Sequence, residues 1–237
     1  MLSPAPSQIE PLSRIVSLTP KSAATRAKLI TVAERLFAEK GVEGVSLAEI
    51  NRVARQRHSN ACHYHFGSKD GLIQAILDKH VPAISASRNA IFDTMEVAGA
   101  ATLGDIVRAF VRPVAAKLFD PNGGKDFIRF NAQLVARHTL ASRGLASPYS
   151  MPETDRLTRK LKAAMAERSL ADGLVEGRLM MAAIMLFHGL ADYSRLRDAA
   201  PGAQDRADTE RFISDLETMI EGTLTAPSAA GMVSPTE

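Results

Sequence analysis

Apolar residues recur every three or four positions along most of the chain, which is the spacing of amphipathic helices. The first stripe starts after Thr25 and stops before Gly41, a residue type that commonly closes a helix. This stripe consists of Leu29, Val32, Ala33, Leu36 and Phe37. No segment alternates apolar and polar residues as a half-buried strand would. The pattern therefore predicts an all-α protein.

A second helix is expected at about residues 47–55. Ser46 and Glu49 have the spacing of a capping box, in which each side chain accepts a hydrogen bond from the other residue's backbone N–H. The inward stripe behind this cap consists of Leu47, Ile50, Val53 and Ala54. A polar turn from Arg55 to His58 follows, so this helix is short.

Two more helices are predicted directly after this turn. Ser59 is expected to cap a very short third helix that buries Cys62 and Phe66, four positions apart. Gly67 ends this helix, and a fourth is expected from Lys69 to about Lys79. The inner face of the fourth helix consists of Leu72, Ile73, Ile76 and Leu77.

Pro82 is expected to separate the fourth helix from the next, after which the helical pattern continues. Further helices are predicted at 83–98, 103–119, 125–141, 154–171, 175–198 and 207–224. Proline and serine are frequent in residues 1–22, and proline, serine and glycine in 226–237, which predicts a disordered arm and a disordered tail. Residues 23–80 and 81–225 are predicted to form a small and a larger helical domain.

Positive charge gathers near the N-terminus. Residues 1–80 contain 11 Lys and Arg against 7 Asp and Glu, whereas residues 81–237 contain 18 against 19. This excess favours an acidic partner such as nucleic acid, although proteins that never meet DNA have the same balance. Arg14, Lys21 and Arg26 would let the N-terminal arm contact phosphates; a solvated tail is the alternative.

The chain has the composition of a cytoplasmic protein. Its single cysteine, Cys62, excludes an intrachain disulfide and fits a reducing compartment. No apolar run reaches the roughly 18 residues that span a bilayer, and the longest is Leu179 to Phe187. Residues 1–20 lack the basic start, apolar block and cleavage site of a signal peptide. We therefore expect no membrane partner.

Residues 57–66 combine the properties of a helix that enters a DNA major groove. Cys62 and Phe66 supply an apolar inner face. The outward positions hold small, polar and aromatic side chains, namely Ser59, Asn60, Ala61, His63 and Tyr64. Lys69 opens the next helix, where its ammonium and the free backbone N–H groups would hold one phosphate. This segment is thus the candidate DNA-binding site.

The segment Thr25 to Leu77 resembles the DNA-binding domain of the TetR family of bacterial transcriptional regulators. The resemblance rests on LFAEKGVEGVSLAEI and YHFGSKDGLIQAIL, which occur at compatible separations. It implies a three-helix helix-turn-helix domain with a connector helix, followed by a larger helical domain for ligand binding and dimerisation. The DNA-binding residues assigned on this basis are Ser46, Arg57, His58, Ser59, Asn60, Ala61, His63, Tyr64, His65 and Lys69.

Two places depart from the family pattern. Many members have Ala-Gly-Val-Ser in the turn, whereas residues 54–59 of this chain read ARQRHS and are one residue longer. An extra residue would relieve the strain that otherwise requires glycine. Two consecutive aromatics often precede the His in the family, but here His63 precedes Tyr64. The alternatives are a core position for Tyr64 and a solvated face for the arginines of residues 52–57.

Helix 175–198 is apolar on more than one face and must bury both. With the last helix it is expected to pack on its two-fold mate as a four-helix bundle, a monomer core being the alternative. The predicted dimer residues are Leu179, Ala183, Leu186, Leu190, Tyr193, Phe212, Leu216 and Met219. Candidate ligand contacts, each also a candidate core residue, are Phe110, Phe119, Phe127, Arg129, Phe130, Gln133, His138, Met165, Met185 and His188.

The main functional prediction is a homodimeric repressor that a small apolar molecule releases from its operator. The ligand would favour a separation of the two DNA-binding domains that does not fit DNA. A constitutive DNA-binding protein and a helical enzyme or carrier are the alternatives. The chain lacks a Gly-Lys-Ser/Thr phosphate loop, His-Glu-x-x-His, a cysteine cluster and Gly-x-Ser-x-Gly, so we expect no catalysis, cofactor or metal site.

Overall fold

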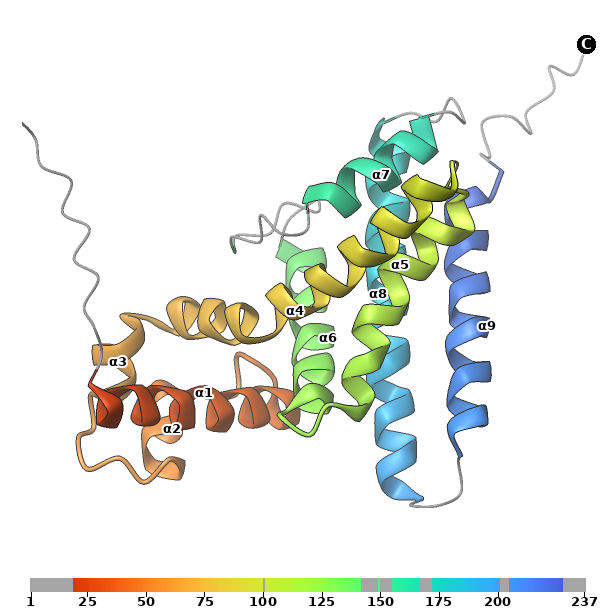
Figure 1. The fold of residues 1–237 in the computed structure, drawn as a ribbon. Coiled ribbons are helices and arrows are strands. Elements are labelled where there is room, and N and C mark those ends of the chain that lie inside the picture. The colour runs from red at the N-terminus through yellow and green to blue at the C-terminus, as the bar shows by residue number, and fades with distance from the viewer. Residues whose placement is uncertain are drawn as a thin grey trace, which may run out of the picture.

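The computed structural model confirms the all-α prediction: its described residues form nine α-helices and one 3₁₀ helix, without strands (Figure 1). The structure describes residues 19–99, 101–141, 149, 155–166, 172–200 and 205–227. The helices are α1 (Pro20–Lys40), α2 (Leu47–Val53), α3 (Ala61–Phe66), α4 (Lys69–Ala98), α5 (Leu103–Ala115), η1 (Ala116–Phe119), α6 (Gly124–Ala141), α7 (Asp155–Ala166), α8 (Asp172–Ala199) and α9 (Arg206–Thr225).

The N-terminal domain consists of α1, α2, α3 and the first half of α4, which lie together at one end of the molecule (Figure 1). Helix α1 begins at Pro20, inside the arm predicted for residues 1–22. Pro20 favours this start because its ring fixes a helical φ, and the Thr19 side chain accepts a hydrogen bond from the Ser22 N–H at 3.3 Å. The rest of the arm and residues 228–237 of the tail lie outside the described residues.

Proline does not end the helices in which it occurs. The predicted break at Pro82 is wrong, because α4 is continuous from Lys69 to Ala98. Pro82 removes only the hydrogen bond to the carbonyl four residues earlier, and buried neighbours such as Val81 and Ile84 anchor the helix on the core. The two halves of α4 run in different directions (Figure 1). Pro113 likewise lies within α5, and the helix predicted for 103–119 becomes α5 followed by the 3₁₀ helix η1.

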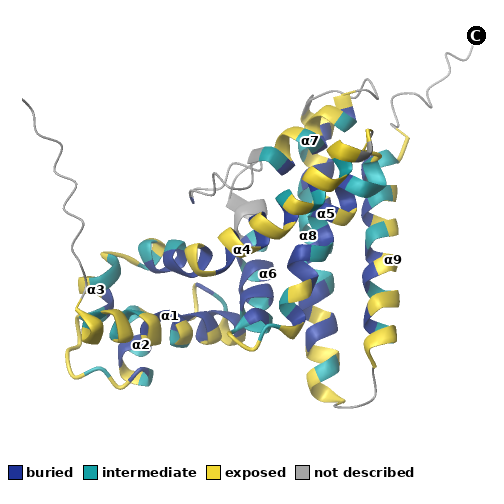
Figure 2. Cartoon of the chain, in the orientation of Figure 1, coloured by how far each residue is buried: buried dark blue, intermediate teal, exposed yellow. Residues whose placement is uncertain are grey.

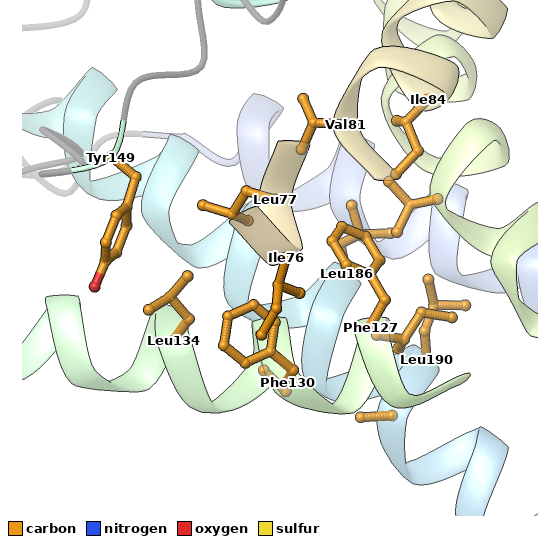
Figure 3. Close-up of a cluster of buried hydrophobic side chains, with 14 of the residues drawn as sticks. Ile76, Leu77, Val81, Ile84, Phe127, Phe130, Leu134, Tyr149, Leu186 and Leu190 are labelled. Carbon is orange, nitrogen blue, oxygen red and sulfur yellow. The ribbon is translucent and has the colours of Figure 1, made fainter. Parts of the chain in front are cut away.

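The buried side chains of the described residues form one continuous cluster that extends through both domains. Helix α6 packs on α1 on one side and on α8 on the other. The rings of Phe37 in α1 and Phe130 in α6 stack with their centroids 5.9 Å apart. Figure 3 shows Ile76 of α4 and Leu186 of α8 in the same cluster as Phe130. The N-terminal domain is therefore held directly on the C-terminal helices.

Helix α8 is apolar along much of its length. Although no membrane segment was expected, Gly173–Ala199, with a mean hydropathy of 1.4, passes a test of length and composition for a membrane-crossing helix. In this structure it packs on α6, α7 and α9 and buries Leu179, Leu186 and Leu190. Core packing thus accounts for part of its apolar character, because 33% of its most apolar stretch is buried.

Candidate nucleic-acid interface

The N-terminus of α2 is capped as predicted by Ser46, whose hydroxyl accepts a hydrogen bond from the Glu49 N–H at 3.1 Å. The second half of the predicted capping box is absent. The Glu49 carboxylate instead accepts a hydrogen bond from Lys40 Nζ at 2.7 Å, and this bond lowers the pKa of Glu49. The resulting ion pair connects the end of α1 to α2. Ser46 therefore acts as a helix cap in this structure, and its contact with DNA stays a prediction.

The turn after α2 retains the backbone conformation that glycine usually supplies. Arg55 has a φ of 53° and is the one non-glycine residue with positive φ among the described residues. The extra residue of this turn therefore does not relieve the strain, contrary to expectation. Arg55 and Arg57 are exposed and have no acidic partner in the described part of the chain, whereas Arg52 lies 4.0 Å from Glu49. Two arginines are thus free to contact phosphate.

Asn51 of α2 fixes the position of α3, a role that the sequence interpretation missed. Its side chain is buried, accepts a hydrogen bond from the Cys62 N–H at 3.0 Å and donates one to the Ser59 carbonyl. The cap residue of α3 is Asn60, not Ser59 as predicted, and its own side chain makes no capping bond. Asn51 satisfies a free N–H of the first turn instead. The sequence held one sign of this role, because Asn51 is a polar residue next to the inward-facing Ile50.

Helix α3 buries Cys62 and exposes His63 and Tyr64 as predicted, whereas Phe66, predicted to be buried, is half-buried. Cys62 is fully buried, and burial raises its pKa to about 11, which keeps the thiol protonated and unreactive. Tyr64 is 79% exposed, so the alternative of a core position is wrong. Ala61 is half-buried against the core. The exposed side chains of the turn and α3, called the recognition surface below, are Arg55, Arg57, His58, Ser59, Asn60, His63 and Tyr64. Figure 2 shows that the segment between α2 and α3 is largely exposed.

His65 and Lys69 are less accessible than the recognition surface. The His65 ring packs edge-on to Tyr64 with centroids 5.1 Å apart, and burial, followed by the charge of Arg26, lowers its pKa. If His65 is neutral at pH 7, it would bind a phosphate through a hydrogen bond and not through a positive charge. Lys69 Nζ lies 6.0 Å from the centroid of the Phe37 ring, a cation–π contact. To contact DNA as predicted, each of these two side chains would have to leave its present contact or keep it while it also contacts DNA.

Two family models match the chain. "Bacterial regulatory proteins, tetR family" matches residues 29–76, which include the whole recognition surface, and "Tetracyclin repressor-like, C-terminal domain" matches residues 108–223. The chain belongs to the TetR family. It is therefore a TetR-family transcriptional regulator with an N-terminal helix-turn-helix domain and a C-terminal ligand-binding domain. Regulators of this family act by binding DNA and not by catalysis.

The solved structures to which the chain is similar are distant in sequence. A TetR-family regulator from Pectobacterium atrosepticum is 22% identical, with a TM-score of 0.38, and the match covers 88% of this chain and 98% of that one. A gamma-butyrolactone receptor (ArpA-like protein) is 19% identical, with a TM-score of 0.43 and coverages of 84% and 98%. The ketosteroid regulator KstR2 of Mycobacterium tuberculosis is 14% identical, with a TM-score of 0.43 and coverages of 83% and 93%. No curated protein matches the chain.

The candidate ligand residues of this TetR-family chain differ in how far they are buried. Those with core positions are Phe127, Phe130 and Met165, and those that are half-buried are Phe110, Gln133, Met185 and His188. Phe119 is half exposed beneath Arg197, and Arg129 pairs with Asp198. The His138 side chain lies outside the described residues. Two hollows of about 400 and 390 Å³ are lined by described residues, and Phe119 and Arg129 border the second.

Most of the predicted dimer residues are buried within one chain. These are Leu179, Leu186, Leu190, Tyr193 and Leu216. The Tyr193 ring stacks on Phe212 at 4.1 Å, and its hydroxyl donates to Thr209 Oγ1 at 3.0 Å, so this group joins α8 to α9. The assignment of these five to a dimer face needs correction, because they are buried within one chain, where α8 packs on α6 as well as on α9. Ala183, Phe212 and Met219 remain accessible.

Replacing Asn51 by alanine should destabilise the N-terminal domain by about 1–3 kcal/mol, because the Cys62 N–H and the Ser59 carbonyl lose their partner. Denaturant unfolding measures this change. Asn60→Ala is the matched control, since the Asn60 side chain makes no capping bond, and it should change stability by less than about 0.5 kcal/mol. Equal losses in the two variants would contradict the role of Asn51.

Replacing Arg55 by glycine should stabilise the protein by about 0.5–1 kcal/mol, because glycine adopts a φ of 53° without strain. Arg55→Ala removes the same charge but keeps the strained conformation, so its stability should stay near that of the wild type. Thermal unfolding of the three proteins separates the two effects. The same gain in both variants would show that charge, and not backbone strain, is responsible.

Proposed function

We propose that the chain is a homodimeric, ligand-responsive repressor that acts in the cytoplasm and binds operator DNA through the recognition surface. The observation that carries this proposal is that Tyr64 is 79% exposed on a helix held firmly from behind by Asn51 and Cys62. A large aromatic side chain in this position contributes little to the packing of the monomer. In a major groove it would contact base edges and thymine methyl groups.

The recognition surface divides by chemistry into two groups. Arg55 and Arg57 have no acidic partner among the described residues and would hold phosphates, which contribute to affinity without reading sequence. Asn60, His63 and Tyr64 offer hydrogen-bond donors and acceptors from the short helix and would face bases. The domain is small, so two copies on one DNA would be needed for tight binding.

Release of DNA would follow from the way the two domains share helices. Helix α4 belongs to both domains, and α6 packs on α1 as well as on α8. A ligand that shifts α4 or α6 within the C-terminal domain would therefore move the recognition surface. A ligand that binds one arrangement better would shift the population towards it. In a constitutive DNA-binding protein, no small molecule would change DNA binding.

The DNA-binding part of the proposal predicts separate effects for the two chemical groups. Arg57→Ala should weaken binding to all duplexes alike and flatten the slope of log K against log salt by about one. Tyr64→Ala should weaken binding to the preferred sequence by about 1–3 kcal/mol and leave nonspecific binding nearly unchanged. Fluorescence anisotropy at several salt concentrations measures both.

Arg35→Ala is the control for these variants, because Arg35 lies on α1 and pairs with Glu39 at 3.9 Å. Its DNA affinity and salt slope should equal those of the wild type. The absence of DNA binding by the wild type at low salt would overturn the proposal, and so would an equal loss on specific and nonspecific DNA for Tyr64→Ala.

The proposed dimer face lies on the outer side of α8 and α9. Apolar side chains remain exposed there, among them Met181, Leu196 and Met219, which is 52% exposed. Phe212 and Ala183, two further residues of α9 and α8, are half-buried. An apolar face on two neighbouring long helices fits association with the same face of a second copy.

Met219→Asp should therefore weaken dimerisation at least tenfold, because a carboxylate would be buried without a partner. Sedimentation velocity at micromolar concentration gives the oligomeric state. Val97→Asp is the control, since Val97 is a more exposed apolar residue that lies on α4 and is not part of the proposed face, and it should leave the dimer intact. A monomeric wild type, or equal behaviour of the two variants, would contradict the proposed face.

A further inference from the structure

Two polar side chains occupy core positions on the second half of α4. Val81, Ile84, Ser85, Arg88 and Phe92 follow one another at helical spacing and are all buried. Ser85 is 2% exposed, and its hydroxyl has no hydrogen-bond partner. Arg88 is 4% exposed and lies one turn further along the same face. This face therefore combines an unsatisfied hydroxyl with a buried guanidinium.

One contact of Arg88 has a structural explanation. Its Nε donates a hydrogen bond to the Ala109 carbonyl of α5 at 3.1 Å. That carbonyl has no helical partner, because Pro113, four residues later, has no N–H. A neutral side chain such as glutamine could supply the same hydrogen bond. The structural role therefore requires a donor but does not require a positive charge.

The remainder of the Arg88 guanidinium is unpaired. Neither Nη group has an acceptor among the described residues, and no acidic side chain of those residues pairs with it. The Nη atoms keep a small contact with solvent, because Ser85 Oγ is the one fully enclosed polar side-chain atom without a partner in the described part of the chain. Burial still lowers the pKa of Arg88 to about 10. Arg178 shows the contrast: its Nη1 donates to the Leu224 carbonyl at 2.9 Å and its Nη2 to that of Ala226, so it caps the end of α9. A buried charge without a partner is costly, and an anionic ligand would supply the partner.

We propose that Arg88 and Ser85 bind the carboxylate of an apolar organic acid in the C-terminal domain. The two Nη groups form a planar fork that matches the two oxygens of a carboxylate, and the Ser85 hydroxyl donates a further hydrogen bond. The assignment rests on the proposed function, because it names the chemical class of the effector. It refines the expectation of a simply apolar molecule.

The surroundings favour a monoanion with an apolar body. A single guanidinium balances one negative charge. A phosphate monoester carries about 1.5 to 2 negative charges near pH 7, so part of its charge would stay unbalanced. Ile84, Phe92 and Ala109 around the two polar residues are apolar and buried. Arg88 also lies eight residues, or about 12 Å of helix, beyond His80, which faces α1. A ligand at Arg88 therefore acts on the helix that holds the N-terminal domain.

The test uses the full chain as wild type, Arg88→Gln and Ser85→Ala, with Arg108→Gln as a control because Arg108 is exposed on the neighbouring α5. Thermal unfolding is measured without additive, and then with decanoate, phenylacetate and benzoate, each compared with its uncharged amide. Without additive, Arg88→Gln should raise Tm by about 2–4 °C, because glutamine keeps the bond to Ala109 and removes the unpaired charge.

At least one carboxylate should raise the Tm of the wild type and of Arg108→Gln, while its amide does not. Arg88→Gln should lose at least tenfold in affinity for that acid, and Ser85→Ala roughly fivefold to tenfold. A lower Tm for Arg88→Gln without additive, equal responses to acids and amides, or no response to any carboxylate would overturn the proposal. None of these measurements involves DNA, so a failure to bind operator would count against the proposed function alone.

Discussion

The arrangement of the two domains depends on one buried carboxylate, that of Glu34 in α1. Lys79 Nζ lies 2.6 Å from its Oε2 and His80 Nε2 lies 2.5 Å from its Oε1, and both partners belong to α4. Phe127 of α6 covers the His80 ring at a centroid distance of 4.3 Å. Gly123 leaves room for the carboxylate, since a Cβ there would lie 2.6 Å from Oε2. Removing one partner of such a buried pair costs about 3–5 kcal/mol, so α1, α4 and α6 hold one relative position.

This constraint gives α4 two functions in one helix. Its first half completes the core of the N-terminal domain through Leu72 and Ile76, and its second half places Ser85 and Arg88 in the C-terminal core. Because Pro82 bends the path without ending the helix, a displacement near Arg88 cannot be absorbed in a loop between the domains. A displacement of α4 in one domain would therefore move the other domain through the contacts of Glu34.

The sequence predicted those features that depend on local patterns. Helical spacing and the Ser46 cap located α1, α2 and α3, and the same spacing placed Cys62 inside and Tyr64 outside. Features that depend on distant partners were missed. Asn51 bonds to residues 8 and 11 positions away, across a turn whose geometry was unknown.

The assignments on α8 and at Pro82 failed for a related reason. Leu186 and Leu190 are apolar whether α8 meets another helix of its own chain or a second chain, and only the packing decides between these cases. The rule that proline ends a helix is local, and core contacts on both sides of Pro82 outweigh it. The sequence also held a sign of the buried Arg88 that was not used. Arg88 is a charged residue on the same helix face as Ile84 and Phe92, in an otherwise apolar stripe.

The proposed function requires that two copies of a firmly held recognition surface read DNA together. This requirement can be tested by selecting bound duplexes from a pool of random DNA with the purified full chain. We expect enrichment of one inverted repeat, with half-sites separated by about one or more helical turns of DNA. Recovery of no preferred sequence, or of a single half-site without its repeat, would contradict it.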